Sequence, residues 1–255
     1  MNAVSGRVGG TLRYLLIATQ WSFLAGAALL VAGGVALVAR WPNALWPLHG
    51  AALGLVMGAA AVAVDERCAL VVDVSPRPLW WRTAVRSVGP TILILVWAAV
   101  HWVLRAPLPD HLEVLILQGV VAAGLGFGLA TAARAAGHSE PGAVLAATAV
   151  PLVAGAALAR PFETDLPLFP VWPHEDWGRA ALIWAVLGTA AALVAGRALW
   201  RGAGRAGPAA ARLLAIGDPG SAIGATEQSR PEAFGPVPHL EEPCRPPPSA
   251  ASPRR

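Results

Sequence analysis

The sequence contains no lysine at all, so its 19 basic side chains are all arginines. A nucleotide-binding P-loop uses a lysine to reach the phosphates, and its pattern G-x-x-x-x-G-K-[ST] is missing. The metalloprotease pattern H-E-x-x-H and the hydrolase pattern G-x-S-x-G are missing as well. We therefore expect no enzyme, no catalytic residues and no ATPase of this type in the chain itself.

Cysteine is nearly absent, since Cys68 and Cys244 are the only two in the chain. There is no C-x-x-C motif and no neighbouring group of histidines and cysteines. Both cysteines fall in segments that we assign below to the cytoplasm, where thiols stay reduced. The sequence thus predicts no disulfide, no zinc or other metal site and no cofactor.

Acidic residues are absent from the central parts of the apolar runs. The clearest polar groups inside apolar runs are Gln20, His101 and Gln118, with Glu113 beside His111 near one end of a run. Ion-coupled transporters usually carry a carboxylate or a charge relay near the middle of the membrane. The absence of a central Asp or Glu disfavours coupling to protons or sodium, and we interpret His101 as a hydrogen-bonding group.

What the chain has in abundance is long apolar sequence. A run of about 24 residues in an α-helix reaches roughly 36 Å, enough to cross the ~30 Å core of a bilayer. Backbone inside a bilayer must satisfy its own hydrogen bonds, so these runs predict an all-α, polytopic integral membrane protein. The six expected transmembrane helices are Leu15–Val38, Trp46–Val64, Thr91–Leu104, Leu112–Ala133, Ala143–Ala159 and Ala180–Leu199.

The arginines indicate the orientation of these helices. They gather before the first run, in the segment Asp65–Gly89, after the fourth run and after the sixth. The remaining segments hold fewer arginines, and the one before the last run is rich in acids. The positive-inside rule therefore predicts that both termini and the Asp65–Gly89 loop are cytoplasmic. The resulting localisation is a multi-pass protein of the cytoplasmic (plasma) membrane.

The composition changes after Arg201. Residues 1–201 form the expected transmembrane domain, and residues 202–255 are rich in Pro, Gly, Ala and Ser. Except for a short helix over Ala209–Ile216, this tail has too little apolar sequence to offset its chain entropy, so we expect it to be disordered and cytoplasmic. The basic pI of about 10.3 comes from arginines in the tail and next to the membrane, where they contact anionic lipid headgroups. We therefore expect no nucleic-acid partner.

Small residues recur every fourth position in two of the expected helices. Gly50, Gly54 and Gly58 do so in the second, and Gly188, Ala192 and Gly196 in the sixth. Residues at this spacing let a neighbouring backbone approach closely. They predict helix packing; a sliding or homodimer surface is the alternative, and ordinary close packing is favoured.

The segment between the second and third runs is the most distinctive. Asp65 can cap a short helix, and the prolines of Ser75-Pro76-Arg77-Pro78 favour an extended turn. From Trp80 onward apolar residues fall on one helical face and Arg82 and Arg86 on the opposite one. Such a segment is expected to lie in the headgroup plane and lead into the third run.

These motifs resemble those of six-helix permease proteins of high-GC bacteria, allied to the ABC-2 class of ATP-binding-cassette transporters. The matching features are Asp65-Glu66, the Ser75–Pro78 turn followed by arginines, and Glu140-Pro141-Gly142, within roughly residues 10–200. In that class the loop between the second and third helices docks on the partner ATPase. By resemblance, partner docking falls to Asp65, Glu66, Arg67, Leu70 and Val71.

Two functional hypotheses follow. The first is the membrane-spanning permease subunit of an ABC-2-like exporter in a bacterial membrane, working as a homodimer with a separately encoded ATP-binding subunit. The second is a non-transporting membrane scaffold or accessory protein that recruits a partner through its loop or tail. The spans offer no charged pocket in sequence, which hints at an amphiphilic or hydrophobic cargo if the protein transports one.

Overall fold

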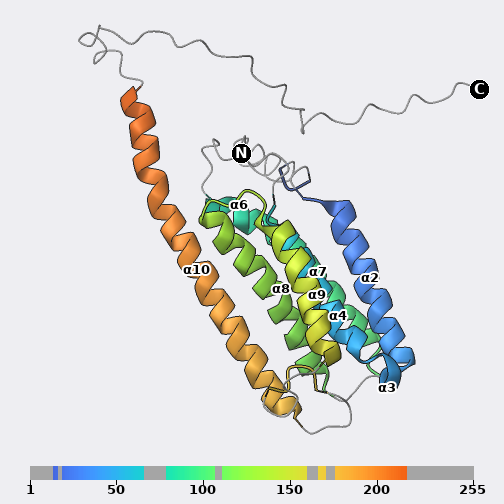
Figure 1. Ribbon diagram of the computed structural model, residues 1–255. Helices are drawn as coiled ribbons and strands as arrows, with labels where there is room; N and C mark the ends of the chain where they lie inside the picture. Colours follow the sequence, from blue (N-terminus) through green and yellow to red (C-terminus); the bar gives the residue numbers. More distant parts are fainter. Residues whose placement is uncertain are drawn as a thin grey trace, which may run out of the picture. The chain divides into compact units, whose positions relative to one another are not determined.

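In the computed structural model, the described part of the chain comprises residues 14–16, 19–65, 79–106, 111–159, 166–170 and 176–216. All regular secondary structure in these residues is helical (Figure 1). The helices are α2 (Trp21–Arg40), α3 (Pro42–Leu45), α4 (Pro47–Val62), α6 (Leu79–Arg86), α7 (Val88–Val103), α8 (Leu112–Ala135), α9 (Pro141–Ala159) and α10 (Trp177–Ile216).

Five stretches of helix are long and apolar enough to cross a membrane. They are Trp21–Arg40, Leu79–Val103, Leu112–Ala135, Pro141–Ala159 and Trp177–Arg201. The expected second span corresponds to α4, which is apolar but has only 16 residues. The structure therefore supports a helical polytopic membrane protein with five candidate spans, and the crossing of the membrane by a sixth helix stays a prediction.

The predicted starts of the first and third helices differ from the structure in ways that matter for the spans. The first helix begins at Trp21, well after Leu15, because the backbone at Gln20 leaves the helical conformation. The third begins at Val88 and follows α6 with only Ser87 between them, so the two helices join in one candidate span of 25 residues. This continuity supplies the length that the run Thr91–Leu104 lacks.

The bundle is built around the short helix α4. It packs against α2, α8 and α9, while α7 packs against α2 and α8 (Figure 1). Figure 1 shows α3 at one end of this bundle and α6 at the other. Ten of the sixteen residues of α4 are buried. Enclosure by protein explains why a helix of this length can stay at the centre, where it meets little lipid.

Side chains are distributed in the inverse of the soluble pattern. Large apolar residues face outward, with Leu29, Leu152 and Leu182 at least 65% exposed. The buried set is rich in Ala and Val and includes His49, His101 and the arginines of α6. In a bundle surrounded by lipid, leucine gains little from moving into the interior, whereas polar groups are stabilised when they face inward. This distribution agrees with the apolar length of the helices.

The chain divides into two units, residues 1–206 and 207–255. The helix α10 continues through position 201 to Ile216, so it passes the boundary predicted between transmembrane domain and tail. It also includes the short helix expected over Ala209–Ile216. The rest of the tail, residues 217–255, lies outside the described residues, and its disorder stays a prediction.

Candidate functional site

Asp65 is the one predicted docking residue that the structure describes; Glu66, Arg67, Leu70 and Val71 lie in the segment 66–78, outside the described residues. Asp65 is buried directly after α4. Its Oδ1 accepts a hydrogen bond of 2.7 Å from the backbone N–H of Gly142, and its Oδ2 one of 2.7 Å from that of Ala143. Both donors belong to the first turn of α9, where backbone N–H groups have no partner within the helix. Asp65 thus caps a helix that begins far away in sequence.

The same carboxyl group is perturbed by its surroundings. Burial raises the pKa of Asp65 above its ordinary value of 3.8, and this effect outweighs the two hydrogen bonds from α9 and the nearby Arg86, which favour the ionised form. Glu140 adds a smaller effect in the same direction as burial. The ionised form is the one that matches the positive end of the α9 helix dipole.

Arg86 closes the other side of this junction. Its Nη1 donates to the backbone carbonyls of Val64 and Asp65, each at 2.7 Å, and its Nε lies 3.4 Å from the hydroxyl of Tyr14. These carbonyls follow the last turn of α4, where helices leave acceptors unsatisfied and a positive charge is favoured. Asp65 and Arg86 therefore tie α4, α6 and α9 together, and we call this set of bonds the Asp65–Arg86 latch.

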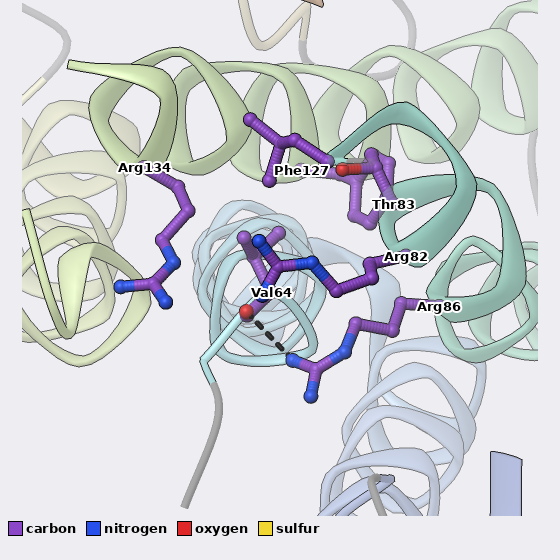
Figure 2. Close-up of a pocket in the computed structure, with 7 residues that line it drawn as sticks. Val64, Arg82, Thr83, Arg86, Phe127 and Arg134 are labelled. Carbon is purple, nitrogen blue, oxygen red and sulfur yellow. Dashed lines mark hydrogen bonds between the residues drawn. The ribbon is translucent and has the colours of Figure 1, made fainter. Parts of the chain in front are cut away.

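Next to the latch, three arginines line one small pocket. It lies between the end of α4, helix α6 and the last turns of α8. In Figure 2, Arg82 and Arg86 enter from α6 on one side of Val64, and Arg134 enters from α8 on the other. We call this the arginine pocket, and its lining is Val64, Leu79, Arg82, Thr83, Arg86, Phe127 and Arg134.

The polar face of α6 points into this pocket. Arg82, Thr83 and Arg86 are buried, whereas Trp80 on the apolar face is 52% exposed. The two faces predicted from the sequence are present, and their orientation is now known. The arginines point into the bundle, and the tryptophan faces outward, where a bilayer would surround it.

The opposite end of the bundle is closed by uncharged groups. Gln118 of α8 lies 3.1 Å from Nε2 of His49 through its Oε1, and its Nε2 donates to the carbonyl of Leu168 at 3.3 Å. Trp184 Nε1 donates to the same carbonyl, and Trp46 Nε1 donates to the carbonyl of Pro170, both at 2.9 Å. These bonds hold the loop 166–170 on the helix ends.

Stacked rings fill the space beneath this loop. Trp46 stacks on His49 at 5.1 Å and meets Trp177 edge-on at 6.0 Å, measured between ring centroids. Trp97 and His101 of α7 lie 4.3 Å apart, and His49 and His101 lie 5.5 Å apart. The sequence had singled out His101 and Gln118 but not His49. A histidine in the first turn of an apolar run is the signal that could have found it.

The predicted packing glycines have different surroundings. Gly50, Gly54 and Gly58 of α4 all face α9, where a Cβ atom would contact Ala157, Val150 or Ala146. At Gly188 of α10 a Cβ atom would lie 2.9 Å from Val121 of α8. At Gly196 nothing lies within 4 Å. Close approach of a neighbouring backbone thus occurs at Gly50, Gly54 and Gly58, whereas the close contact at Gly188 is with a side chain.

The fold and these contacts define a class: a polytopic membrane protein of helical type, with a charged latch at one end and a neutral aromatic cluster at the other. Compared with known proteins, the chain matches no family model, no curated protein and no solved structure. The likeness to ABC-2 permeases therefore rests on the sequence motifs alone.

Proposed function

We propose that this chain is the membrane-spanning permease subunit of an ABC-2-like exporter in a bacterial cytoplasmic membrane, with six helices crossing the membrane. A separately encoded ATPase supplies the energy, and two copies of the chain form the pathway. The supporting observation is the way the segment 66–78 is anchored. Asp65 at its start is bonded to α9, and Arg86, shortly after its end, is bonded to the end of α4.

This anchoring gives a mechanical route by which binding of the ATPase to the segment 66–78 is coupled to movement of the helices. A partner that pulls on the segment 66–78 acts through Asp65 on the first turn of α9 and through α6 on Arg86. The same two residues meet at the end of α4, the central helix. Movement of the loop is thereby converted into movement of α4 and α9 relative to the other helices. In switching proteins, a packed element with two arrangements connects a binding event to a distant rearrangement. In this proposal, α4 and α9 are that element.

The packing of α4 on α9 favours a second candidate, a scaffold that does not transport. Gly50, Gly54 and Gly58 bring the two helices so close that a methyl group would contact α9 at each position. Such contact leaves no route between these two helices within one chain. A scaffold would use the segment 66–78 or the tail to recruit its partner.

A charge exchange in the loop tests the proposal. The double variant Glu66→Arg/Arg67→Glu keeps the net charge and leaves Asp65 and Arg86 in place. Like charges brought together at an interface cost several kcal/mol, so we expect loss of co-purification with the ATPase encoded beside this gene. Stimulation of ATP hydrolysis by the membrane protein should be lost with it.

The matched control is Arg160→Glu/Glu163→Arg, an equal exchange in the segment predicted to face the opposite side of the membrane. It should co-purify the ATPase as the wild type does. Retained binding and hydrolysis in Glu66→Arg/Arg67→Glu would exclude the docking role of this loop. Failure of the wild type itself to bind any neighbouring ATPase would favour the scaffold.

A further inference from the structure

We propose that His49 and His101 make the α3 end of the bundle sensitive to acid: proton uptake by this pair releases the loop 166–170 from the helix ends. Both rings are buried, His49 in the first turn of α4 and His101 in the last turn of α7. Their ring centroids lie 5.5 Å apart, and the ring planes stand at 86° to each other. This pair is separate from the coupling segment, so the proposal applies to a permease and to a scaffold alike.

The hydrogen bonds of the two rings show which nitrogen carries the proton in each neutral side chain. Gln118 Nε2 donates to the carbonyl of Leu168, so its Oε1 faces His49 and accepts a hydrogen bond from Nε2–H of that ring. Nδ1 of His101 lies 2.9 Å from the carbonyl of Trp97, which likewise requires an N–H at Nδ1. Because a neutral imidazole has a single N–H, Nδ1 of His49 and Nε2 of His101 are acceptors without a proton.

These two acceptor nitrogens are buried and have no hydrogen-bond partner among the described residues. A proton that binds to either one becomes an N–H without an acceptor, on a cation shielded from water. Burying such a cation costs far more free energy than burying the neutral ring. Attraction to the faces of Trp46 and Trp97 offsets part of this cost for one proton, but a second proton would face the first across 5.5 Å. The closed arrangement therefore favours two neutral rings.

The charged groups at this end of the bundle do not compensate a proton on the pair. The titratable group that acts electrostatically on His49 is His101, and no carboxylate of the described residues acts on either ring. His111 of α8 stacks on Trp177 instead, with 4.8 Å between the ring centroids. The loop 166–170 contains no titratable side chain. The described charged residues near this end are all exposed: Arg40, Arg105, Glu113, Asp176 and Arg179.

The side chains that cover His49 are also those that hold the loop. Trp46 stacks on His49 at 5.1 Å with the ring planes 7° apart, and its Nε1 donates to the carbonyl of Pro170. Gln118 is bonded both to His49 and to the carbonyl of Leu168. Movement of His49 into water therefore displaces two of the three described side chains that donate to the loop. Hydration of the protonated ring and release of the loop occur together.

The size of the effect follows from the number of protons. The released state exposes two histidines that bind protons freely, whereas the closed state disfavours both protons. Free histidine takes up a proton below about pH 6.5, and each proton bound in only one state shifts the equilibrium about tenfold per pH unit. The population of the released state should therefore rise by about tenfold to a hundredfold for each pH unit below this value.

Hydroxyl-radical labelling of the full-length protein in detergent tests the proposal. Oxidised residues are located by mass spectrometry at about pH 7.5 and about pH 5, on either side of the ordinary histidine titration. Trp46 and Trp184 are 4% and 5% exposed, and we expect their oxidation to be at least about tenfold faster at the lower pH. Trp200, which is 84% exposed, and Met57, farther along α4, should keep their rates.

Histidine variants identify the groups responsible. His49→Gln/His101→Gln removes both titratable rings and should leave Trp46 equally protected at the two pH values. Each single variant retains one ring and should show the smaller response of one proton, which decides the matter if the double variant is poorly folded. The matched control His138→Gln removes an exposed histidine after α8 and should respond to acid as the wild type does.

Three results would overturn the proposal. Unchanged protection of Trp46 in the wild type would show that acid does not open this end. A parallel increase in the oxidation of Met57 would replace local release by unfolding of the whole bundle. A full response in either single variant, or a response abolished by His111→Gln, would assign the acid sensitivity to groups other than this pair.

Discussion

The two ends of the helical bundle are closed by different chemistry. At the end that holds α6, charged side chains bind backbone groups: Asp65 binds N–H groups of α9, and Arg86 binds carbonyls after α4. At the end that holds α3, neutral Trp46, Gln118 and Trp184 bind carbonyls of the loop 166–170. Arginine on one side and tryptophan at the interface are the two preferences that a membrane imposes on helix ends.

The difference has energetic consequences. A hydrogen bond with an ionised partner is about twice as strong as a neutral one, but removing one partner leaves a larger penalty behind. The α6 end therefore depends on few residues, each with a large effect. The α3 end spreads its stability over several rings and amides, each with a small effect. Replacing single residues at the two ends measures this difference.

The largest effect is expected for Asp65→Ala. The change leaves two backbone N–H groups at the start of α9 without their acceptors. It also removes the carboxylate that interacts electrostatically with Arg86. We expect a loss of about 2–4 kcal/mol in stability, from the removal of charged hydrogen bonds and of a helix cap. This loss of stability is measured as the shift of the unfolding midpoint in detergent, which is monitored by size-exclusion chromatography of the heated protein.

Two companions make the Asp65 result specific. Asp65→Asn retains one oxygen as an acceptor and should lose less than Asp65→Ala. Glu140→Gln changes an exposed carboxylate beside α9 and should stay within about 0.5 kcal/mol of the wild type. A midpoint for Asp65→Ala equal to that of Glu140→Gln would show that the latch contributes nothing to stability.

A smaller effect is expected at the α3 end, for Gln118→Leu. The substitution keeps similar volume but removes the bonds to His49 and to the carbonyl of Leu168. Since Trp184 still donates to that carbonyl, we expect a loss of about 1–2 kcal/mol, typical of a buried neutral group left without its partner.

Gln20→Leu is the matched control for Gln118→Leu. Gln20 stands at the start of α2 and makes no side-chain cap bond there, so its replacement should have little effect on the unfolding midpoint. If Gln118→Leu destabilised the protein as strongly as Asp65→Ala, the proposed contrast between the two ends would be wrong.

The comparison also shows what the sequence could predict. Apolar runs identified the helices, because length and hydropathy are local properties. The sequence also predicted that Arg82 and Arg86 lie on one face of a helix, since helical spacing alone decides it. It could not predict that this face is buried, or that Asp65 caps α9 across 77 positions. Those facts depend on which helices become neighbours, and no local pattern carries that information.

The helix boundaries and the neutral polar groups also show which features the sequence can predict and which depend on the folded backbone and on neighbouring helices. The apolar composition continues across Thr19 and Gln20, so the sequence predicts a helix that begins at Leu15, whereas the backbone bends at these two residues. The sequence pattern gives His49 little weight, because it is one polar residue in a long apolar run. Its role emerges only when α7 and α8 bring Trp97, His101 and Gln118 next to it.

The smallest effect is expected in α10, where two positions of one helix, one near the α3 end and one farther from it, are compared. Near the α3 end, Trp177, Ala180 and Trp184 are buried, whereas Trp200 is 84% exposed. An added methyl group at Gly188 would lie 2.9 Å from Cγ2 of Val121, but one at Gly196 would meet nothing within 4 Å. Replacing glycine by alanine inside a helix stabilises it by roughly 0.5–1 kcal/mol when there is room. Crowding at Gly188 should cancel or reverse this gain.

We therefore expect Gly196→Ala to be neutral or slightly stabilising and Gly188→Ala to unfold at the lower midpoint, with a difference of about 1 kcal/mol between them. Both substitutions add the same group to the same helix, so propensity cancels in the comparison and contact with α8 remains. Purification of both variants in one detergent, with midpoints measured in parallel, resolves a difference of this size. Identical midpoints would mean that α10 is no more firmly packed at Gly188 than at Gly196, and the contact with Val121 would then contribute nothing to stability.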